Sequence, residues 1–262
     1  MEEVSGMQSV DVLETLELLA SSQWGLVTTA QASEAGVSKM HLSRLADRGT
    51  VHRVRHGVYA LPSTDAGPLQ GLRAAWLATG SQPAGDQLRA VVSGESAAAV
   101  HGLGDLLPSK YEFATAVRRQ TTQPDIRYRK RELPDEDVTQ VNGLPVTTVS
   151  RTVNDLATGG TDFDHLATVV RDAVTVTDVA PAALVRALDP VAKRFGSSDG
   201  GDLVSALLKA AGYRPDLRAL ELLSPALQEN FAQAVAPHLK NTLSEAIAEH
   251  FRRLTPKLDF PH

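Results

Sequence analysis

Residues 36–61, GVSKMHLSRLADRGTVHRVRHGVYAL, decide the fold of the first part of this chain. Ser38 is a favourable helix N-cap and Gly49 a favourable residue for ending a helix, so a short helix is expected at residues 39–48. After that helix, residues 50–61 contain two β-branched runs separated by a turn that ends in glycine. This pattern predicts a tight β-hairpin directly after the helix.

A second short helix is expected immediately before this segment. Thr28 or Thr29 can cap it, and Ala35 is its last residue because a glycine follows. Residues 10–21 show the apolar spacing of a longer amphipathic helix. Two short helices separated by a tight turn form the core of a helix-turn-helix, and a hairpin after the second helix forms a wing. The sequence therefore predicts a winged helix-turn-helix over residues 1–62.

The expected helix at residues 39–48 has two different faces. Leu42, Leu45 and Ala46 share an apolar arc that suits a core. The residues on the opposite arc and its flanks are Lys39, Met40, Ser43, Arg44, Asp47 and Arg48. These types match the major groove of DNA: arginine can bind guanine or phosphate, serine a base edge or phosphate, and exposed methionine a thymine methyl group. The helix N-terminus behind Ser38 suits a backbone phosphate.

The predicted wing adds Arg53, Arg55 and His56. Residues around a hairpin turn project from a domain, and arginine there suits phosphates or a narrow minor groove. The alternative is that these side chains are ordinary solvated charges on a small α/β unit. The order of cap, stop, basic outward face and wing favours DNA binding.

The rest of the chain predicts an α+β protein with three parts: residues 1–62, a mixed α/β domain at residues 70–158, and a helical region at residues 159–262. A linker rich in Pro, Gly, Ser and Thr is expected at residues 62–69. The middle part predicts helices at 72–78, 94–101 and 150–157, the last capped by Ser150, and strands at 111–117, 126–129, 138–141 and 144–146. In the helical region, breaks are expected at Pro181, Pro190, residues 196–201, Pro215, Pro225 and Pro237.

A net charge of −5 over 262 residues argues mildly against nucleic-acid binding, but the basic residues are clustered. Residues 39–57 hold five Lys or Arg against one acid, and residues 117–131 hold six against one. Binding depends on the local potential of one face, so a mildly acidic protein can carry a basic footprint.

The second basic cluster has several interpretations. Its members are Arg118, Arg119, Arg127, Arg129, Lys130 and Arg131. On a strand, Arg127, Arg129 and Arg131 would share one face. That face could contact phosphates or an acidic partner, or it could be a solvated surface balanced by nearby acids. The candidate acids are Glu132, Asp135, Glu136 and Asp137.

Several enzyme and binding classes are disfavoured. The chain has no cysteine and no metal-type histidine motif, and residues 196–201 lack the lysine of a phosphate-binding loop. Residues 94–96, with His101 nearby, lack the second glycine of a nucleophile elbow, and capping explains them better. Arg151 and Asp155 are expected to form a structural ion pair. We therefore expect no catalysis, metal or cofactor, and, from the acidic start and short apolar runs, a cytoplasmic protein.

Phrases in both the first and second parts resemble the AbiEi-type antitoxin family over residues 28–157. The phrases are residues 27–30, 36–38 and 53–61, followed by SGESAAAVHG at 93–102 and GLPVTTVSRTVNDLA at 143–157. The resemblance implies an antitoxin of a bacterial toxin–antitoxin or abortive-infection operon, paired with a nucleotidyltransferase-like toxin. It also implies binding to inverted repeats in the operon's own promoter, which the protein represses.

The resemblance also implies which residues face double-stranded DNA. They are Thr28, Ser38, Lys39, Met40, Ser43, Arg44, Arg53, Arg55 and His56, to which the helix pattern adds Arg48. Two alternatives stay open. In a partner- or ligand-sensing module with a purely structural winged helix, the surface around Arg44 and Arg55 would be neutral or acidic. A degenerate nuclease would have converging carboxylates in its second domain.

Overall fold

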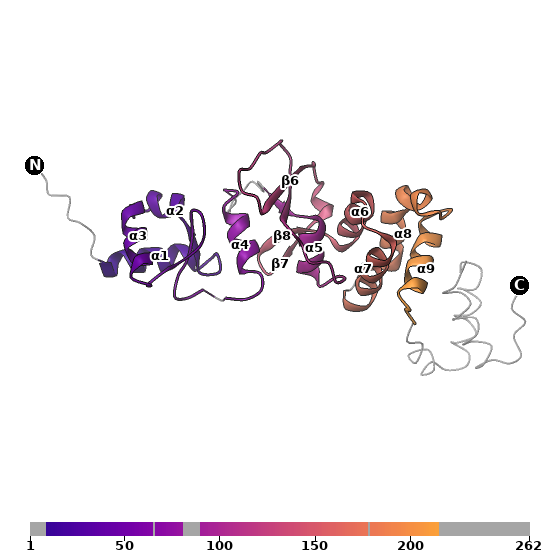
Figure 1. Ribbon diagram of the computed structural model, residues 1–262, viewed down its shortest axis with the longest axis horizontal. Helices are drawn as coiled ribbons and strands as arrows, with labels where there is room; N and C mark the ends of the chain where they lie inside the picture. The colour runs from indigo at the N-terminus through magenta and orange to yellow at the C-terminus, as the bar shows by residue number, and fades with distance from the viewer. Residues whose placement is uncertain (1–8, 65, 81–89, 178, 215–262) are drawn as a thin grey trace, which may run out of the picture. The chain divides into compact units, whose positions relative to one another are not determined.

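The computed structural model describes residues 9–64, 66–80, 90–177 and 179–214. It shows the expected α+β class, with two small sheets and several helices (Figure 1). The chain divides into two compact units. Unit 1 contains Met1–Val100 and Pro108–Thr148, and unit 2 contains His101–Leu107 and Val149–His262.

The start of unit 1 holds the expected helix-turn-helix and hairpin. Its helices are α1 (Ser9–Ala20), α2 (Thr29–Glu34) and α3 (Lys39–Asp47), and its strands are β1 (Leu26–Thr28), β2 (His52–Arg55) and β3 (Val58–Ala60). The strands form an antiparallel sheet in the order β1-β3-β2, so β2 lies at its edge. We refer to β2, β3 and the turn between them, residues 52–60, as the wing.

Apolar side chains from all three helices close the core of this part. Leu16 of α1, Ala32 of α2 and Leu42 of α3 are fully buried together with Val27 and Val37. Burial of such side chains away from water is the main favourable term in folding. The core therefore fixes which face of α3 remains outside.

The second part of unit 1 is a mixed five-stranded sheet with two helices. Its elements are α4 (Gln70–Leu77), β4 (Val91–Val92), α5 (Gly94–His101), β5 (Tyr111–Thr115), β6 (Ile126–Lys130), a 3-10 turn (Asp135–Asp137), β7 (Val138–Val141) and β8 (Leu144–Thr147). The strand order is β6-β5-β4-β8-β7, with β5–β6 and β4–β8 parallel and the other pairs antiparallel. The sequence analysis missed β4, which is only two residues long.

A shared core joins the two parts of unit 1. Leu26 and Val58 of the first sheet are buried in one cluster with Trp76 and Phe113. Trp24 reaches across as well: its indole Nε1 donates a 2.9 Å hydrogen bond to the carbonyl of Asn142, in the turn between β7 and β8. The predicted linker therefore connects segments that pack together, and the division into 1–62, 70–158 and 159–262 stays a prediction.

From Val149 onward, the described residues of unit 2 form helices and the short connections between them, as expected for the region that begins at residue 159. It contains α6 (Val149–Gly159), α7 (Phe163–Val176), α8 (Pro181–Leu188), a 3-10 segment (Asp189–Phe195) and α9 (Gly200–Ala210). Helix α6 begins at Val149, so Ser150 lies in the first turn and the predicted cap is wrong by position. The predicted pair is confirmed, with 2.9 Å between Arg151 Nε and Asp155 Oδ1. The predicted breaks at Pro215, Pro225 and Pro237 lie outside the described residues.

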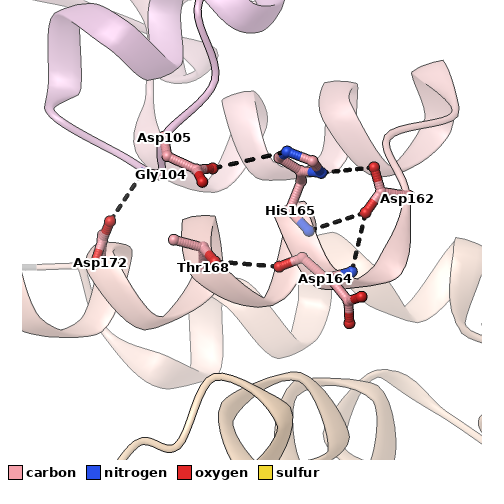
Figure 2. A network of polar contacts seen from close by, with 7 residues as sticks. All are labelled: Gly104, Asp105, Asp162, Asp164, His165, Thr168 and Asp172. Atoms are coloured by element: carbon pink, nitrogen blue, oxygen red, sulfur yellow. Dashed lines mark hydrogen bonds and ion pairs between the residues drawn. The ribbon is translucent and has the colours of Figure 1, made fainter.

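Gly104 and Asp105 contact α7 through polar groups near the start of that helix and farther along it (Figure 2). The Asp162 carboxylate caps α7 by accepting from two backbone amides and lies 2.7 Å from Nδ1 of His165. His165 Nε2 lies 3.9 Å from Asp105, and the Gly104 amide donates to Asp172 at 2.8 Å. Pairing with Asp162 raises the pKa of His165, and hydrogen bonds from His165, its backbone amide first, lower the pKa of Asp162.

Candidate nucleic-acid interface

The exposed face of α3 matches the helical-wheel expectation. Leu42 is 0% exposed and Leu45 is buried, whereas Met40 is 61% exposed. The exposed residues on this helix and at its end are Lys39, Met40, Ser43, Arg44, Asp47 and Arg48. Three of these are cations and one is an acid, so the face is locally basic although the chain is acidic. A locally basic surface of this kind attracts negatively charged groups such as phosphates.

Both short helices begin with side-chain caps. The Ser38 hydroxyl accepts a 3.2 Å hydrogen bond from the backbone amide of His41, so the expected cap of α3 is present. Thr28 caps α2 and forms a capping box with Gln31. The hydroxyl of Thr28 is therefore used inside the protein, where it sets the start of α2. Its contact with DNA stays a prediction.

The wing contains an irregularity that the alternating sequence did not indicate. Arg53 lies opposite Tyr59, but Arg55 lies opposite Val58, so β2 carries one more residue than β3 in this interval. Such a β-bulge bends the strand and re-aims the side chains beyond it. Arg53 and Arg55 are two residues apart, and in a regular strand they would point to the same face. In this wing, Arg53 is exposed and the side chain of Arg55 is largely buried.

Arg53 stays at the surface of the wing, next to His56. Its Nη2 lies 2.8 Å from Nδ1 of His56, and both side chains are exposed. Both residues are therefore exposed on the wing, and their contact with DNA stays a prediction.

Arg55 instead turns toward the second part of unit 1. Its side chain is only 11% exposed, and its Nη2 lies 3.2 Å from Asp125 Oδ1. The same Nη2 also donates to the side-chain oxygen of Gln123. The guanidinium that we expected at the DNA surface is thus already engaged by the loop that precedes β6. Nothing in the sequence pattern pointed to Gln123 or Asp125, because they lie about seventy positions away.

The second basic cluster is divided among several partners. Arg127 and Arg129 share one face of β6, as expected, and both pair with the buried carboxylate of Glu112 on β5. Glu112, which the sequence analysis did not single out, therefore balances these two residues. Arg119 donates to the carbonyl of Thr79 and lies over the ring of Tyr128. Arg118 is exposed, and the backbone amide of Arg131 donates to Thr115.

Other kinds of site are not evident in the described part of the chain. Within residues 9–64, 66–80, 90–177 and 179–214, no three His, Asp or Glu side chains lie close enough together to hold a metal ion. None of the helices in the same ranges is long and apolar enough to cross a bilayer. The exposed basic residues of α3 and of the wing are therefore the group whose possible ligand is considered below.

Comparison with known proteins gives two family matches. Residues 14–62 match the family described as a transcriptional regulator, AbiEi antitoxin, and residues 90–197 match the AbiEi antitoxin C-terminal domain. Among solved structures, the Rv2827c protein of Mycobacterium tuberculosis is 19% identical, with 76% of each chain covered and a TM-score of 0.45. Comparison with curated proteins finds no match. The two family matches fall on the helix-turn-helix part and on the segment that follows it, and the chain belongs to the AbiEi-type antitoxin family.

Proposed function

We propose that this chain is a DNA-binding antitoxin that represses its own operon and counteracts a nucleotidyltransferase-like toxin encoded beside it. The observation that carries the DNA-binding half is the exposed basic face of α3, which lies opposite the buried side chains of Leu42 and Leu45. The match of residues 14–62 to a transcriptional-regulator family supports the same assignment.

The arrangement suits a helix lying in the major groove. Met40, Ser43 and Arg44 occupy the outward side of the first two turns, which is the part of a recognition helix that meets base edges. Lys39 and Arg48 lie at the two ends, where phosphates of the groove walls would be within reach. In this proposal Arg44 supplies the largest single contribution, because arginine can bind guanine through two hydrogen bonds.

The antitoxin half of the proposal rests on residues 90–197, which match the AbiEi antitoxin C-terminal domain. We propose that the part of the chain after the helix-turn-helix opposes the toxin and that the pair serves in phage defence by abortive infection. The nucleotidyltransferase-like identity of the toxin follows from the resemblance of the sequence phrases to the family.

A gel-shift titration with the promoter of the protein's own operon tests the DNA-binding half. The wild type should shift a fragment that carries the inverted repeats, and Arg44→Ala should weaken binding by about fivefold to 150-fold, as expected for loss of about 1–3 kcal/mol. Arg186→Ala is the matched control, because Arg186 is also an exposed arginine in the last turn of a short helix, α8 in unit 2. No shift by the wild type at moderate salt would favour a protein-interaction module with a structural winged helix.

A growth assay tests the antitoxin half separately. The neighbouring nucleotidyltransferase-like protein is expressed from an unrelated inducible promoter, with this chain supplied from another. The wild type should restore growth, and Arg44→Ala should restore it equally, because repression of the native promoter plays no part in this arrangement. Failure of the wild type to restore growth would contradict the proposed antagonism while leaving the DNA-binding half intact.

A further inference from the structure

We propose that Arg55 is a positioning residue that fixes the wing to the loop before β6, rather than a residue that contacts DNA. This inference rests on the proposed DNA-binding function. In this proposal, Arg53 and His56 make the DNA contacts of the wing. Asp125 and Gln123 hold the wing in place by binding Arg55.

The side chain of Arg55 lies in a largely buried environment. It is 11% exposed, although it belongs to a hairpin that carries exposed His52, Arg53 and His56. Its Nη2 is shared between the Asp125 carboxylate and the Gln123 amide oxygen. Its Nε is buried and has no hydrogen-bond partner in the described structure. A guanidinium buried to this degree would have to break both contacts and leave its packing before it could reach a phosphate.

The two residues that hold Arg55 are themselves held by hydrogen bonds of their backbone. Asp125 directly precedes β6, and its backbone carbonyl accepts a 2.8 Å hydrogen bond from the amide of Tyr111 on β5. The carbonyl of Gln123 accepts from the amide of Ile126, and its amide donates to the hydroxyl of Thr121. The acceptors for Arg55 are therefore held by the five-stranded sheet, whose strands are parallel at this point.

Arg55 lies at the end of the strand at the edge of the wing's sheet. Strand β2 is the edge strand of the first sheet, so hydrogen bonds with β3 hold it on one side only. Arg55 is the last residue of β2, immediately before the turn. The bulge between Arg53 and Arg55 turns this one cation toward Asp125 while the preceding one stays outside. The contact thus fixes the free edge close to the tip that we propose meets DNA.

The opposite account makes Asp125 a competitor of phosphate. In that case Arg55 would leave Asp125 on binding, and neutralising Asp125 would strengthen binding and add one phosphate contact. The two accounts therefore differ in sign, because loss of an anchor weakens binding whereas loss of a competitor strengthens it.

The test uses the full-length protein and the promoter fragment that the wild type shifts, with affinity measured across a salt series. Asp125→Asn keeps the shape of the side chain and removes its charge, and Arg55→Met keeps the aliphatic stem. Each should weaken binding by about threefold to fivefold, as expected for an ion pair that is partly exposed. The slope of log affinity against log salt concentration should be unchanged, because no phosphate contact is lost. Arg53→Ala, by contrast, should flatten the slope by about one unit. Glu136→Gln, an exposed acid in unit 1, is the matched control for Asp125→Asn.

Hydrogen exchange of the free protein gives a second readout that does not depend on DNA. In Asp125→Asn the amides of residues 52–60 should exchange faster, while those of α1 should be unchanged. Tighter binding by Asp125→Asn, or a slope flattened by about one unit in Arg55→Met, would overturn the inference, as would unchanged exchange in the wing. If the wild type fails to bind the promoter, the proposed function fails, and the exchange experiment still decides whether Arg55 holds the wing.

Discussion

Helix α3 and the wing both carry cations that the sequence predicts on one surface, but only the helix presents them as expected. In α3, Leu42 and Leu45 are buried, and the cations Lys39, Arg44 and Arg48 are exposed. In the wing, Arg53 is exposed, whereas Arg55 turns inward to Asp125. The difference lies in how each element fixes the direction of its side chains.

A helix sets its own side-chain directions, because its hydrogen bonds join residues four apart in the same segment. The direction of a side chain on a strand depends on the register with the neighbouring strand, and one extra residue changes it. The face of α3 could therefore be predicted from residues 39–48 alone. The face of β2 depends on its register with β3, and the alternating sequence predicted the hairpin but not the bulge that shifts this register.

The largest expected effect is a loss of stability when a residue on the buried side of α3 is replaced. Leu42→Ala should lower the free energy of unfolding by about 2–5 kcal/mol, because it removes a fully buried side chain and leaves a cavity. Met40→Ala, on the exposed face, should change it by about 0.5 kcal/mol or less. Urea denaturation followed by circular dichroism measures both. Equal losses for the two variants would mean that the two faces of α3 are not distinguished as described.

The next effect is at the turn of the wing. Gly57 has a φ of +77°, a conformation that L-residues with a Cβ adopt at a cost of about 1–2 kcal/mol. An added Cβ would lie 3.8 Å from the Thr29 hydroxyl, so the cost comes from the backbone and not from a clash. Gly57→Ala should therefore destabilise the protein by about that amount, and Gly57→Asn by less, since asparagine tolerates this region. A neutral Gly57→Ala would show that the turn differs from the one described.

A smaller effect is expected at the start of α3. Ser38→Ala removes the acceptor for the His41 amide and should cost about 1 kcal/mol. Ser38→Asn keeps an acceptor and should retain most of the stability. Thermal unfolding of the two variants side by side measures the difference, and a similar loss in both would show that the hydroxyl does not cap the helix.

Local signals predicted much of the fold. The bounds of α5, β7 and the helices around the turn at residues 36–38 follow from glycines, capping residues and periodicity, all within a few positions of the element they set. Strand β4 was missed because two buried valines carry too short a pattern to separate a strand from any other apolar pair. Helix α6 begins two residues earlier than a Ser150 cap would allow, because Thr147, Thr148 and Ser150 are all residue types that can cap a helix.

The candidate site could be predicted only where its residues are exposed and lie on one element. The outward residues of α3 needed no knowledge of the rest of the chain. The partners of Arg55 and of Arg127 and Arg129 come from other strands and loops, so their pairing depends on tertiary structure. The sequence shows six Lys or Arg residues within residues 117–131. It does not show that the carboxylate of Glu112 pairs with two of them, Arg127 and Arg129.

The smallest expected effect is on the titration of His165, which forms an exposed pair with Asp162 in unit 2. This pair serves as a reference for the less exposed pair of Arg55 and Asp125 in unit 1. The pKa of His165 is raised above 6.5 by Asp162 first and by Asp105 and Asp164 to a smaller extent, and the pKa of Asp162 is lowered below 3.8. The contribution of His165 is therefore fully present below pH 6.5 and lost as the pH rises through its raised pKa. That of Asp162 is present above pH 3.8 and lost as the pH falls through its lowered pKa.

The stabilising effect of this pair should consequently be greatest between pH 3.8 and 6.5. Titration of the His165 imidazole by NMR should give a midpoint above 6.5, and Asp162→Asn should bring it closer to 6.5 while preserving the helix cap, because asparagine also caps well. His165→Gln identifies the resonance among the eight histidines. A midpoint at or below 6.5 in the wild type would show that the carboxylates do not stabilise the imidazolium. Because solvent screens this pair more than the Arg55 pair, added salt should shift its titration readily, while the contact that holds the wing should respond less.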